Sequence, residues 1–296
     1  MTTLDTTPLT PAFGVEVRGV RLDEVTESRL FPEIRAAFEA HSALLFRDQA
    51  LSPEAHLRLA RLFGPIEDRK ADERAEGEAF EIPEVSNLRA EGGTWGETDL
   101  ATLNLKANML WHTDSTFLPV PALTNILVAR VVPSEGGATE LASTRAAFAA
   151  MSPERQDQLR RLRLRHRYSH SRAQISPELA ELPMFNKWDD QVWPAVWRNP
   201  VNGAEAVYVA SHACAVEGMD AAEGRALIAE LIEACTRPEF VYAHRWRPGD
   251  VLIWDQRAVM HRGTPWPYEE PRKLTSICVS ATPADGLDTM RREAAG

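Results

Sequence analysis

Alternation of apolar and polar residues predicts several short β-strands along this chain of 296 residues. Between residues 13 and 22 the alternation places Val15, Val17 and Val20 near one face of an early strand or hairpin. Similar short runs predict further strands, at 42–48, 124–132, 163–170, 206–210, 240–245, 250–255 and 273–281. Many short strands with few helices between them are typical of a β sandwich or a jelly roll.

Helical patterns interrupt these strands in a few places. Apolar residues recur at helical spacing at about 29–40 and over 220–236. Ser52 followed by Pro53 is a typical helix start, with Ser52 as the N-cap and proline at the first helical position. Ser152 begins another helix in the same way. The overall prediction is a mainly β fold with peripheral helices.

The segment 66–107 shows little periodicity and is rich in Glu, Arg, Gly and Asp. A loop of this length inside a compact domain is usually either functional or disordered. Because the segment leads directly into Trp111 and His112, we expect it to form a mobile lid over a site. The whole chain, 1–296, is expected to fold as a single domain, since domains of this size are common among β proteins.

Composition excludes some classes of partner. The chain has 33 basic and 43 acidic residues and a formal net charge of -10, which makes a nucleic-acid partner unlikely because phosphate binding needs a concentrated basic surface. No signal peptide and no apolar stretch long enough to cross a membrane is present, so a cytoplasmic location without membrane partners is expected. Three widely spaced cysteines indicate neither a disulfide framework nor a cysteine zinc site.

A short histidine motif carries the first chemical signal. His112 and Asp114 are two residues apart, so in an extended backbone both side chains point to the same side. Alone the pair is a weak signal, because a surface hydrogen bond would also explain it. His261 follows 149 residues later, after a Pro-Gly turn and an apolar strand, and Arg272 comes eleven residues after that. Two histidines and one carboxylate on one face of iron(II) leave positions open for co-substrate and dioxygen, as in non-haem oxygenases.

Several motifs together resemble one enzyme family across nearly the whole chain. The motifs are Trp111-His-Thr-Asp-Ser-Thr-Phe, Val131-Val-Pro-Ser-Glu-Gly-Gly-Ala-Thr-Glu, Gly249-Asp-Val-Leu-Ile-Trp-Asp, His261-Arg-Gly and Arg272. In order and spacing they resemble the taurine dioxygenase and 2,4-dichlorophenoxyacetate dioxygenase family of iron(II)/2-oxoglutarate enzymes.

This resemblance implies a double-stranded β-helix, which is a cupin-like jelly-roll core. It implies that His112, Asp114 and His261 bind iron(II) and are the catalytic centre, and that Thr139 and Arg272 bind the far carboxylate of 2-oxoglutarate. A guanidinium can hold a carboxylate through two parallel hydrogen bonds, and a hydroxyl can add a third. Homo-oligomers are common in the family, so self-assembly is a further expectation.

Two stretches and two single positions bear on the substrate, and a third position bears on the metal. The stretches 211–225 and 240–246 look closest to the aryloxyacetate-degrading branch. In relatives with anionic substrates an arginine often follows four residues after the co-substrate arginine, but here that residue is Ser276, which leaves the charge of the substrate open. Gln256 replaces a usual asparagine, and we expect it to adjust the surroundings of the metal. Asn108 matches a substrate-contacting position of the taurine branch, although it could equally be a turn-stabilising amide.

Other histidines and tryptophans have simpler interpretations. His166 and His170 lie in a predicted strand, where four residues span about 13 Å, too far apart to share a metal. For His212 a hydrogen-bonded structural role is favoured over a place at the pocket mouth. Three tryptophans lie close together in the sequence, namely Trp188, Trp193 and Trp197. Tryptophans usually pack in the core or at its rim, but these three are also candidates for pocket walls.

The predicted reaction is hydroxylation of an unactivated C-H bond of a small organic substrate, with release of succinate and carbon dioxide. If the attacked carbon carries an ether oxygen, the product collapses and the ether is cleaved. Two alternatives belong to other classes. A zinc-dependent hydrolase could use the same His/Asp/His set, although Arg272 and Thr139 would then have no role. A jelly-roll binding protein without catalysis would not need an open metal site.

Overall fold

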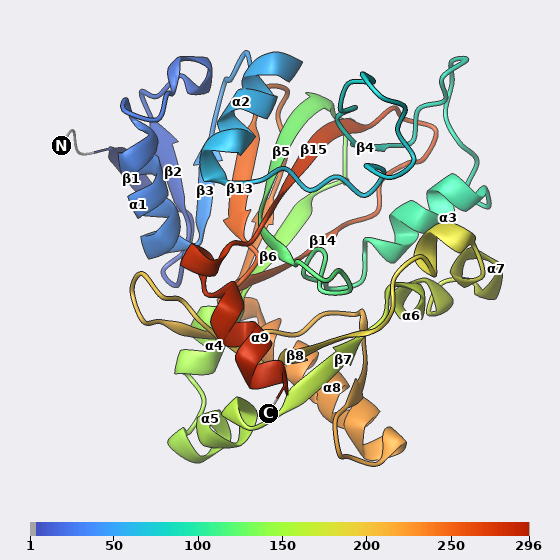
Figure 1. Cartoon of the computed structure of the whole chain (residues 1–296). Coiled ribbons are helices and arrows are strands. Elements are labelled where there is room, and N and C mark those ends of the chain that lie inside the picture. The colour runs from blue at the N-terminus through green and yellow to red at the C-terminus, as the bar shows by residue number, and fades with distance from the viewer. Residues whose placement is uncertain (1–3, 296) are drawn as a thin grey trace.

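The computed structural model describes residues 4–295, which form a mixed α/β fold with several β-sheets (Figure 1). The largest sheet within these residues has seven strands in the order β1-β2-β3-β13-β5-β15-β4. All its neighbours pair antiparallel except β2 and β3, which are parallel. The strand bounds are β1 Asp5–Pro8, β2 Val15–Arg18, β3 Ala43–Phe46, β4 Glu84–Ser86, β5 Ala122–Val131, β13 Val251–Asp255 and β15 Lys273–Ser280.

Smaller antiparallel sheets complete the strand content of the described residues. Their orders are β12-β6-β14, β11-β7-β8 and β10-β9. The bounds are β6 Thr139–Ser143, β7 Arg163–His166, β8 Gln191–Pro194, β9 Val196–Arg198, β10 Glu205–Val207, β11 Ala213–Val216, β12 Val241–His244 and β14 Val259–Gly263. The sheet that contains β6 and β14 matters most for the candidate site, because it faces the large sheet across that site.

The predicted helix starts are confirmed at Ser52 and Ser152, whose hydroxyls accept hydrogen bonds from the backbone of Ala55 and Arg155. The helices in the described part of the chain are α1 Phe31–His41, α2 Pro53–Phe63, α3 Leu100–Ala107, α4 Thr144–Ala149, α5 Pro153–Arg160, α6 Tyr168–Ala173, α7 Pro177–Ala180, α8 Ala221–Cys235 and α9 Leu287–Ala295. Among residues 4–295, no helix combines the length and the apolar character that crossing a bilayer requires.

The large sheet is buried on both faces, and β13 shows how. Successive side chains of a strand point to opposite faces of its sheet. Ile253 therefore joins the apolar cluster under α1 and α2, whereas Leu252 and Trp254 join the cluster that reaches toward β6 and β14. Each of the five residues of β13 is buried, which explains why this strand is a continuous apolar run in the sequence.

The helical content is higher than predicted, and one strand prediction is wrong at its end. The strand expected over 163–170 stops at His166, because β7 pairs with β8 and β11 only over 163–166. The next residues form α6, which packs against α3 and α7 (Figure 1). His170 therefore lies on a helix and not on the predicted strand. Tertiary packing decides the conformation of such a short segment more strongly than its local pattern does.

The segment 66–107 contains regular structure that its composition did not predict. β4 pairs with β15 at the edge of the large sheet, and α3 ends at Ala107, just before the His112 motif. Several residues between 67 and 85 line a large cavity that His112 also lines. The segment is thus in the right place for a lid, while its movement stays a prediction.

Candidate active site

A backbone bridge between distant residues brings the two histidines together. His112 donates its amide hydrogen to the carbonyl of His261 at 2.9 Å, and His261 donates to the carbonyl of His112 at 2.8 Å. His261 lies on β14, and Asp114 follows His112 by two residues. In this group each of the three side chains offers one ligand atom, and these atoms lie within 4.8 Å of one another. The predicted triad therefore converges in space.

A backbone hydrogen bond orients the imidazole of His112 as a metal ligand, whereas Nδ1 of His261 has no hydrogen-bond partner among the described residues. His112 Nδ1 lies 2.7 Å from the carbonyl oxygen of Leu110, so it carries the hydrogen and leaves the lone pair on Nε2. The Nε2 atoms of His112 and His261 lie 3.7 Å and 3.6 Å from the carboxylate of Asp114. Burial lowers the pKa of His112, and it lowers the pKa of His261 to about 3. Both rings are therefore neutral at physiological pH, which is the form that binds a metal.

The carboxylate of Asp114 is held by two amide side chains. Its Oδ2 accepts hydrogen bonds from Asn125 Nδ2 at 2.8 Å and from Gln256 Nε2 at 2.6 Å. Gln256 Oε1 also accepts from the backbone amide of Asp114 at 3.0 Å. Burial raises the pKa of the Asp114 carboxyl, but the hydrogen bond from Asn125 and the nearby positive charge of Arg69 oppose this effect, and the pKa lies below its usual range. Two neutral imidazoles and one oriented carboxylate fit a divalent metal such as iron(II).

Replacing Gln256 with alanine is expected to weaken divalent-metal binding by roughly 10- to 100-fold, the usual effect of removing a group that orients a metal ligand. Asp114 would lose both a side-chain donor and an acceptor for its own amide. The measurement is a Mn(II) titration of the apo-protein, with Gln158→Ala as a control because Gln158 is exposed and distant from the group. Unchanged Mn(II) affinity in the Gln256 variant would show that Asn125 alone orients the carboxylate.

Thr139 and Arg272, the residues expected to hold the co-substrate, line the same cavity as the triad. The buried guanidinium of Arg272 donates from Nε to the carbonyl of Gly137 at 3.2 Å and lies 4.9 Å from the ring centre of Trp266. No described acidic side chain pairs with it. Burial lowers its pKa to about 10, so it stays protonated at neutral pH. Thr139 Oγ1 accepts from Trp246 Nε1 at 3.0 Å, which leaves the threonine hydroxyl hydrogen free to donate.

The cavity that contains these groups has a volume of about 1030 Å³. It lies between the large sheet, which contributes Asn125 and Ser276, and the sheet of β6 and β14. Asn108, the predicted substrate-contacting residue, lies in its wall at the end of α3. A volume of this size accommodates a small organic molecule together with a co-substrate.

The aromatic predictions are corrected in part. Trp188 lines the cavity as expected. Trp193 and Trp197 do not, because both are core residues whose indole nitrogens donate to backbone carbonyls at 2.8 Å and 3.1 Å. His212 also lines the cavity, and neither of its ring nitrogens has a hydrogen-bond partner among the described residues. The favoured interpretation of His212 as a hydrogen-bonded structural residue is therefore wrong.

Sequence reasoning missed the polar groups that α6 brings to the cavity. Tyr168 and Arg172 both line it, and Arg69 reaches the hydroxyl of Tyr168 at 3.2 Å from the segment before β4. No signal pointed to these residues, because the sequence pattern predicts a strand where α6 forms. Tyr168 also stacks on Phe117, with ring centres 3.6 Å apart, which forms an aromatic side of the cavity.

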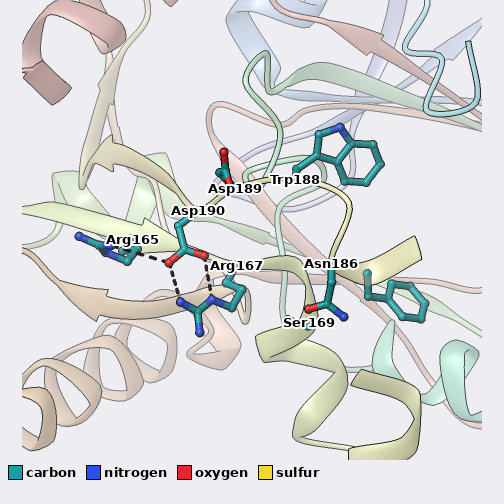
Figure 2. Close-up of a pocket in the computed structure, with 8 residues that line it drawn as sticks. Arg165, Arg167, Ser169, Asn186, Trp188, Asp189 and Asp190 are labelled. Atoms are coloured by element: carbon teal, nitrogen blue, oxygen red, sulfur yellow. Dashed lines mark hydrogen bonds and ion pairs between the residues drawn. The ribbon is translucent and has the colours of Figure 1, made fainter. Parts of the chain in front are cut away.

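A second cavity of about 460 Å³ is lined by charged residues of β7 and of the segment before β8 (Figure 2). Two arginines that line it are paired with one carboxylate: Arg167 donates two hydrogen bonds to Asp190, each at 2.7 Å, and Arg165 lies 3.8 Å from the same group. Because both arginines are already paired and no residue of the triad lines the cavity, we assign it no role in chemistry.

Comparisons with known proteins found similar sequences and solved structures. The model of the "Taurine catabolism dioxygenase TauD, TfdA family" matches residues 5–278. The alpha-ketoglutarate-dependent 2,4-dichlorophenoxyacetate dioxygenase of Cupriavidus pinatubonensis is 36% identical, over 90% of this chain and 94% of its own length. The (S)-phenoxypropionate/alpha-ketoglutarate-dioxygenase of Sphingobium herbicidovorans is 32% identical, over 95% and 96%. The crystal structure of AAD-2 in complex with Mn(II) and N-oxalylglycine is 31% identical and superposes with a TM-score of 0.87, covering 95% of this chain and 99% of AAD-2.

Proposed function

Because this chain belongs to the TauD/TfdA family and is an alpha-ketoglutarate-dependent dioxygenase, we propose that it hydroxylates a C-H bond of a small aryloxyalkanoate-like acid. Alpha-ketoglutarate is 2-oxoglutarate, the co-substrate expected from the sequence. With phenoxyacetate the balanced reaction consumes one dioxygen and one 2-oxoglutarate, and it forms phenol, glyoxylate, succinate and carbon dioxide. The C-O bond breaks when the hydroxylated carbon, which also bears the ether oxygen, collapses to the aldehyde.

The observation that carries this proposal is that the group of His112, Asp114 and His261 lines the same cavity as Thr139 and Arg272. We assign the three residues of the group as ligands of iron(II), the metal that the family uses. Iron(II), when bound, supplies the redox chemistry that activates dioxygen. The three side chains would hold the ion at the wall of the cavity, where the co-substrate and dioxygen could reach it.

The roles of the remaining side chains follow from their charges and hydrogens. Arg272 presents a protonated guanidinium to the far carboxylate of 2-oxoglutarate, and Thr139 donates its hydroxyl hydrogen to the same group. Aromatic side chains such as Phe117 and Trp188 would cover the organic substrate and keep water away from the reacting carbon. The protein thereby holds one C-H bond near the metal in a dry cavity.

The architecture that we propose is a single domain, 1–296, built on a double-stranded β-helix, with 66–107 as a lid. Support comes from the family match over 5–278 and from the position of the cavity between two sheets. A homo-oligomer and a cytoplasmic location stay predictions. A zinc hydrolase or a non-catalytic binding protein is not favoured, because the chain is an alpha-ketoglutarate-dependent dioxygenase.

Succinate formation tests the proposal directly. Iron(II)-loaded protein with 2-oxoglutarate and dioxygen is expected to release succinate and a phenol in equal amounts when phenoxyacetate or (S)-2-phenoxypropionate is added. Taurine and a simple alkyl sulfate serve as comparison substrates, because their oxidation would release sulfite or sulfate and not a phenol. Succinate release that rises with one of these and with none of the aryloxyalkanoates would reject the proposed substrate class.

A further inference from the structure

Buried arginines are rare in this molecule, and their pairing is uneven. Within residues 4–295 the buried arginine side chains are Arg172, Arg257 and Arg272. Arg257 pairs with Asp255 at 2.8 Å and with Glu39 at 2.6 Å. The other two make no ion pair with a described acidic side chain, and both line the cavity of the triad. Burying a charge without a counter-ion costs folding free energy, and binding of an anionic ligand would offset this cost at each of the two guanidinium groups.

Arg172 is 5% exposed and is satisfied only in part by neutral groups. Its Nη1 donates to Ser171 Oγ at 3.1 Å, and its Nη2 donates to Asn108 Oδ1 at 3.3 Å. The buried Nε has no hydrogen-bond partner among the described residues. In contrast, the nearby Arg69, which also lines the cavity, is paired with Glu67 at 2.6 Å. Among the described residues, Arg172 is therefore a buried cation of the cavity wall that has no acidic partner.

From this pairing we propose that Arg172 binds an oxyanion group, a carboxylate or a sulfonate, of the organic substrate. The inference rests on the proposed function and adds the residue that selects the charge of the substrate. Arg272 holds one anion, the co-substrate, and Arg172 holds the other. The two guanidinium groups belong to different elements, since Arg172 lies on α6 and Arg272 directly precedes β15.

The groups around Arg172 are arranged to donate hydrogen bonds to an anion. The hydroxyl oxygen of Tyr168 accepts from Arg69 Nη1 at 3.2 Å and from Arg172 Nη2 at 3.5 Å. Its own hydrogen is then free to point into the cavity. Asn108 accepts from Arg172 through Oδ1, so its NH₂ group also remains available as a donor. An oxyanion at this place would meet a guanidinium, a phenol hydrogen and an amide hydrogen.

The large sheet does not offer an alternative anchor. The residues of β15 that line the cavity, Leu274, Ser276 and Cys278, are uncharged. The hydroxyl of Ser276 is engaged, because it donates to Asn125 Oδ1 at 2.9 Å and so helps to orient the amide that holds Asp114. A serine at position 276 is therefore compatible with an anionic substrate, since the cation is supplied from α6.

The test measures ligand binding without turnover. Full-length protein is loaded with Mn(II) and N-oxalylglycine, and dissociation constants are measured by calorimetry for phenoxyacetate, phenylmethanesulfonate and the neutral phenoxyacetamide. Arg172→Met is expected to weaken binding of the preferred anion by at least about 30-fold, because a buried charge pair is lost. Binding of phenoxyacetamide and of N-oxalylglycine should change by less than roughly 3-fold. Arg172→Lys, which keeps the charge but loses the planar fork, should fall between the two.

Arg167→Ala is the matched control, because Arg167 directly precedes α6 but is exposed and already paired with Asp190. This control should bind all three ligands like the wild type. Tighter binding of phenylmethanesulfonate than of phenoxyacetate would identify a sulfonate as the preferred anion. Tighter binding of phenoxyacetate would identify a carboxylate.

Three results would overturn the proposal. The first is unchanged anion binding in Arg172→Met. The second is an equal loss of phenoxyacetamide binding and anion binding in this variant, which would indicate a structural role for Arg172. The third is that the wild type binds neither anion. Arg172-dependent binding of phenoxyacetate without any succinate release in the turnover assay would instead leave the anion subsite standing and reject the aryloxyalkanoate reaction.

Discussion

Alanine in place of Asp114 is expected to abolish succinate formation and to weaken iron(II) binding by more than the roughly 10- to 100-fold that loss of an outer partner causes. Asp114 is the carboxylate among the three grouped side chains, so it alone can offset part of the charge of a divalent ion. Its removal would leave two neutral imidazoles, His112 and His261, as the remaining ligands. The measurement is an anaerobic iron(II) titration of the apo-protein, followed by the succinate assay.

Asp157→Ala is a suitable control, because Asp157 is exposed on α5 and pairs only with a surface arginine. Asp114→Asn separates charge from shape, since an amide retains one oxygen but not the negative charge. The Asp114→Asn variant should therefore bind iron(II) only slightly more tightly than Asp114→Ala does. Iron(II) binding in Asp114→Ala that equals the wild type would contradict the assignment of this group as the metal site.

Replacement of Arg272 with alanine is expected to raise the dissociation constant of 2-oxoglutarate by about 150-fold, which corresponds to about 3 kcal/mol for loss of a buried ion pair. Arg272 is buried and has no acidic partner among the described residues, so its charge is available to the carboxylate of 2-oxoglutarate and would be lost in the variant. Iron(II) affinity should stay near the wild-type value, since Arg272 makes no contact with the triad. Calorimetric titration with 2-oxoglutarate and with iron(II) separates the two effects.

Lys273→Ala provides the neighbouring control for this variant, because Lys273 lies next in the chain and pairs with Glu84 at the surface. Arg272→Lys should regain part of the affinity, as a single ammonium cannot form two parallel hydrogen bonds with a carboxylate. If alanine at position 272 left the affinity for 2-oxoglutarate intact and lowered that for the organic substrate, the two arginines of the cavity would have exchanged roles.

The difference between Arg272 and Arg172 shows how far sequence reasoning reaches. Arg272 follows His261 at a short, characteristic spacing, so a motif is enough to suggest its role. Arg172 belongs to no such motif, and the alternation that ends in β7 predicts a strand across 163–170. The helix that presents Arg172 forms because it packs against α3 and α7, and such contacts are not written in a local pattern.

The same limit applies within the metal group. The two-residue spacing of His112 and Asp114 predicts a shared face, because alternation is a local property of extended backbone. The hydrogen bonds from Asn125 and Gln256 to Asp114 could not be predicted in this way, since they join β5 and the end of β13 to a turn more than ten residues from either. Gln256 was expected to influence the metal, but its two bonds to Asp114 emerged only in three dimensions.

The chemical class of this protein could be inferred without a structure, because several short motifs resemble one enzyme family in their order and spacing. That His112 and His261 meet across 149 residues is decided only by the tertiary structure. The helices that begin at Ser52 and Ser152 could be inferred as well, since their caps are local hydrogen bonds. Which polar groups remain without a partner inside the cavity depends instead on the packing of distant segments. Arg257 pairs with Glu39, which is far away in the chain, whereas the Nε of Arg172 has no partner among the described residues. Because both side chains are buried, water cannot compensate for a missing counter-ion, and an anionic ligand can bind where the counter-ion is missing.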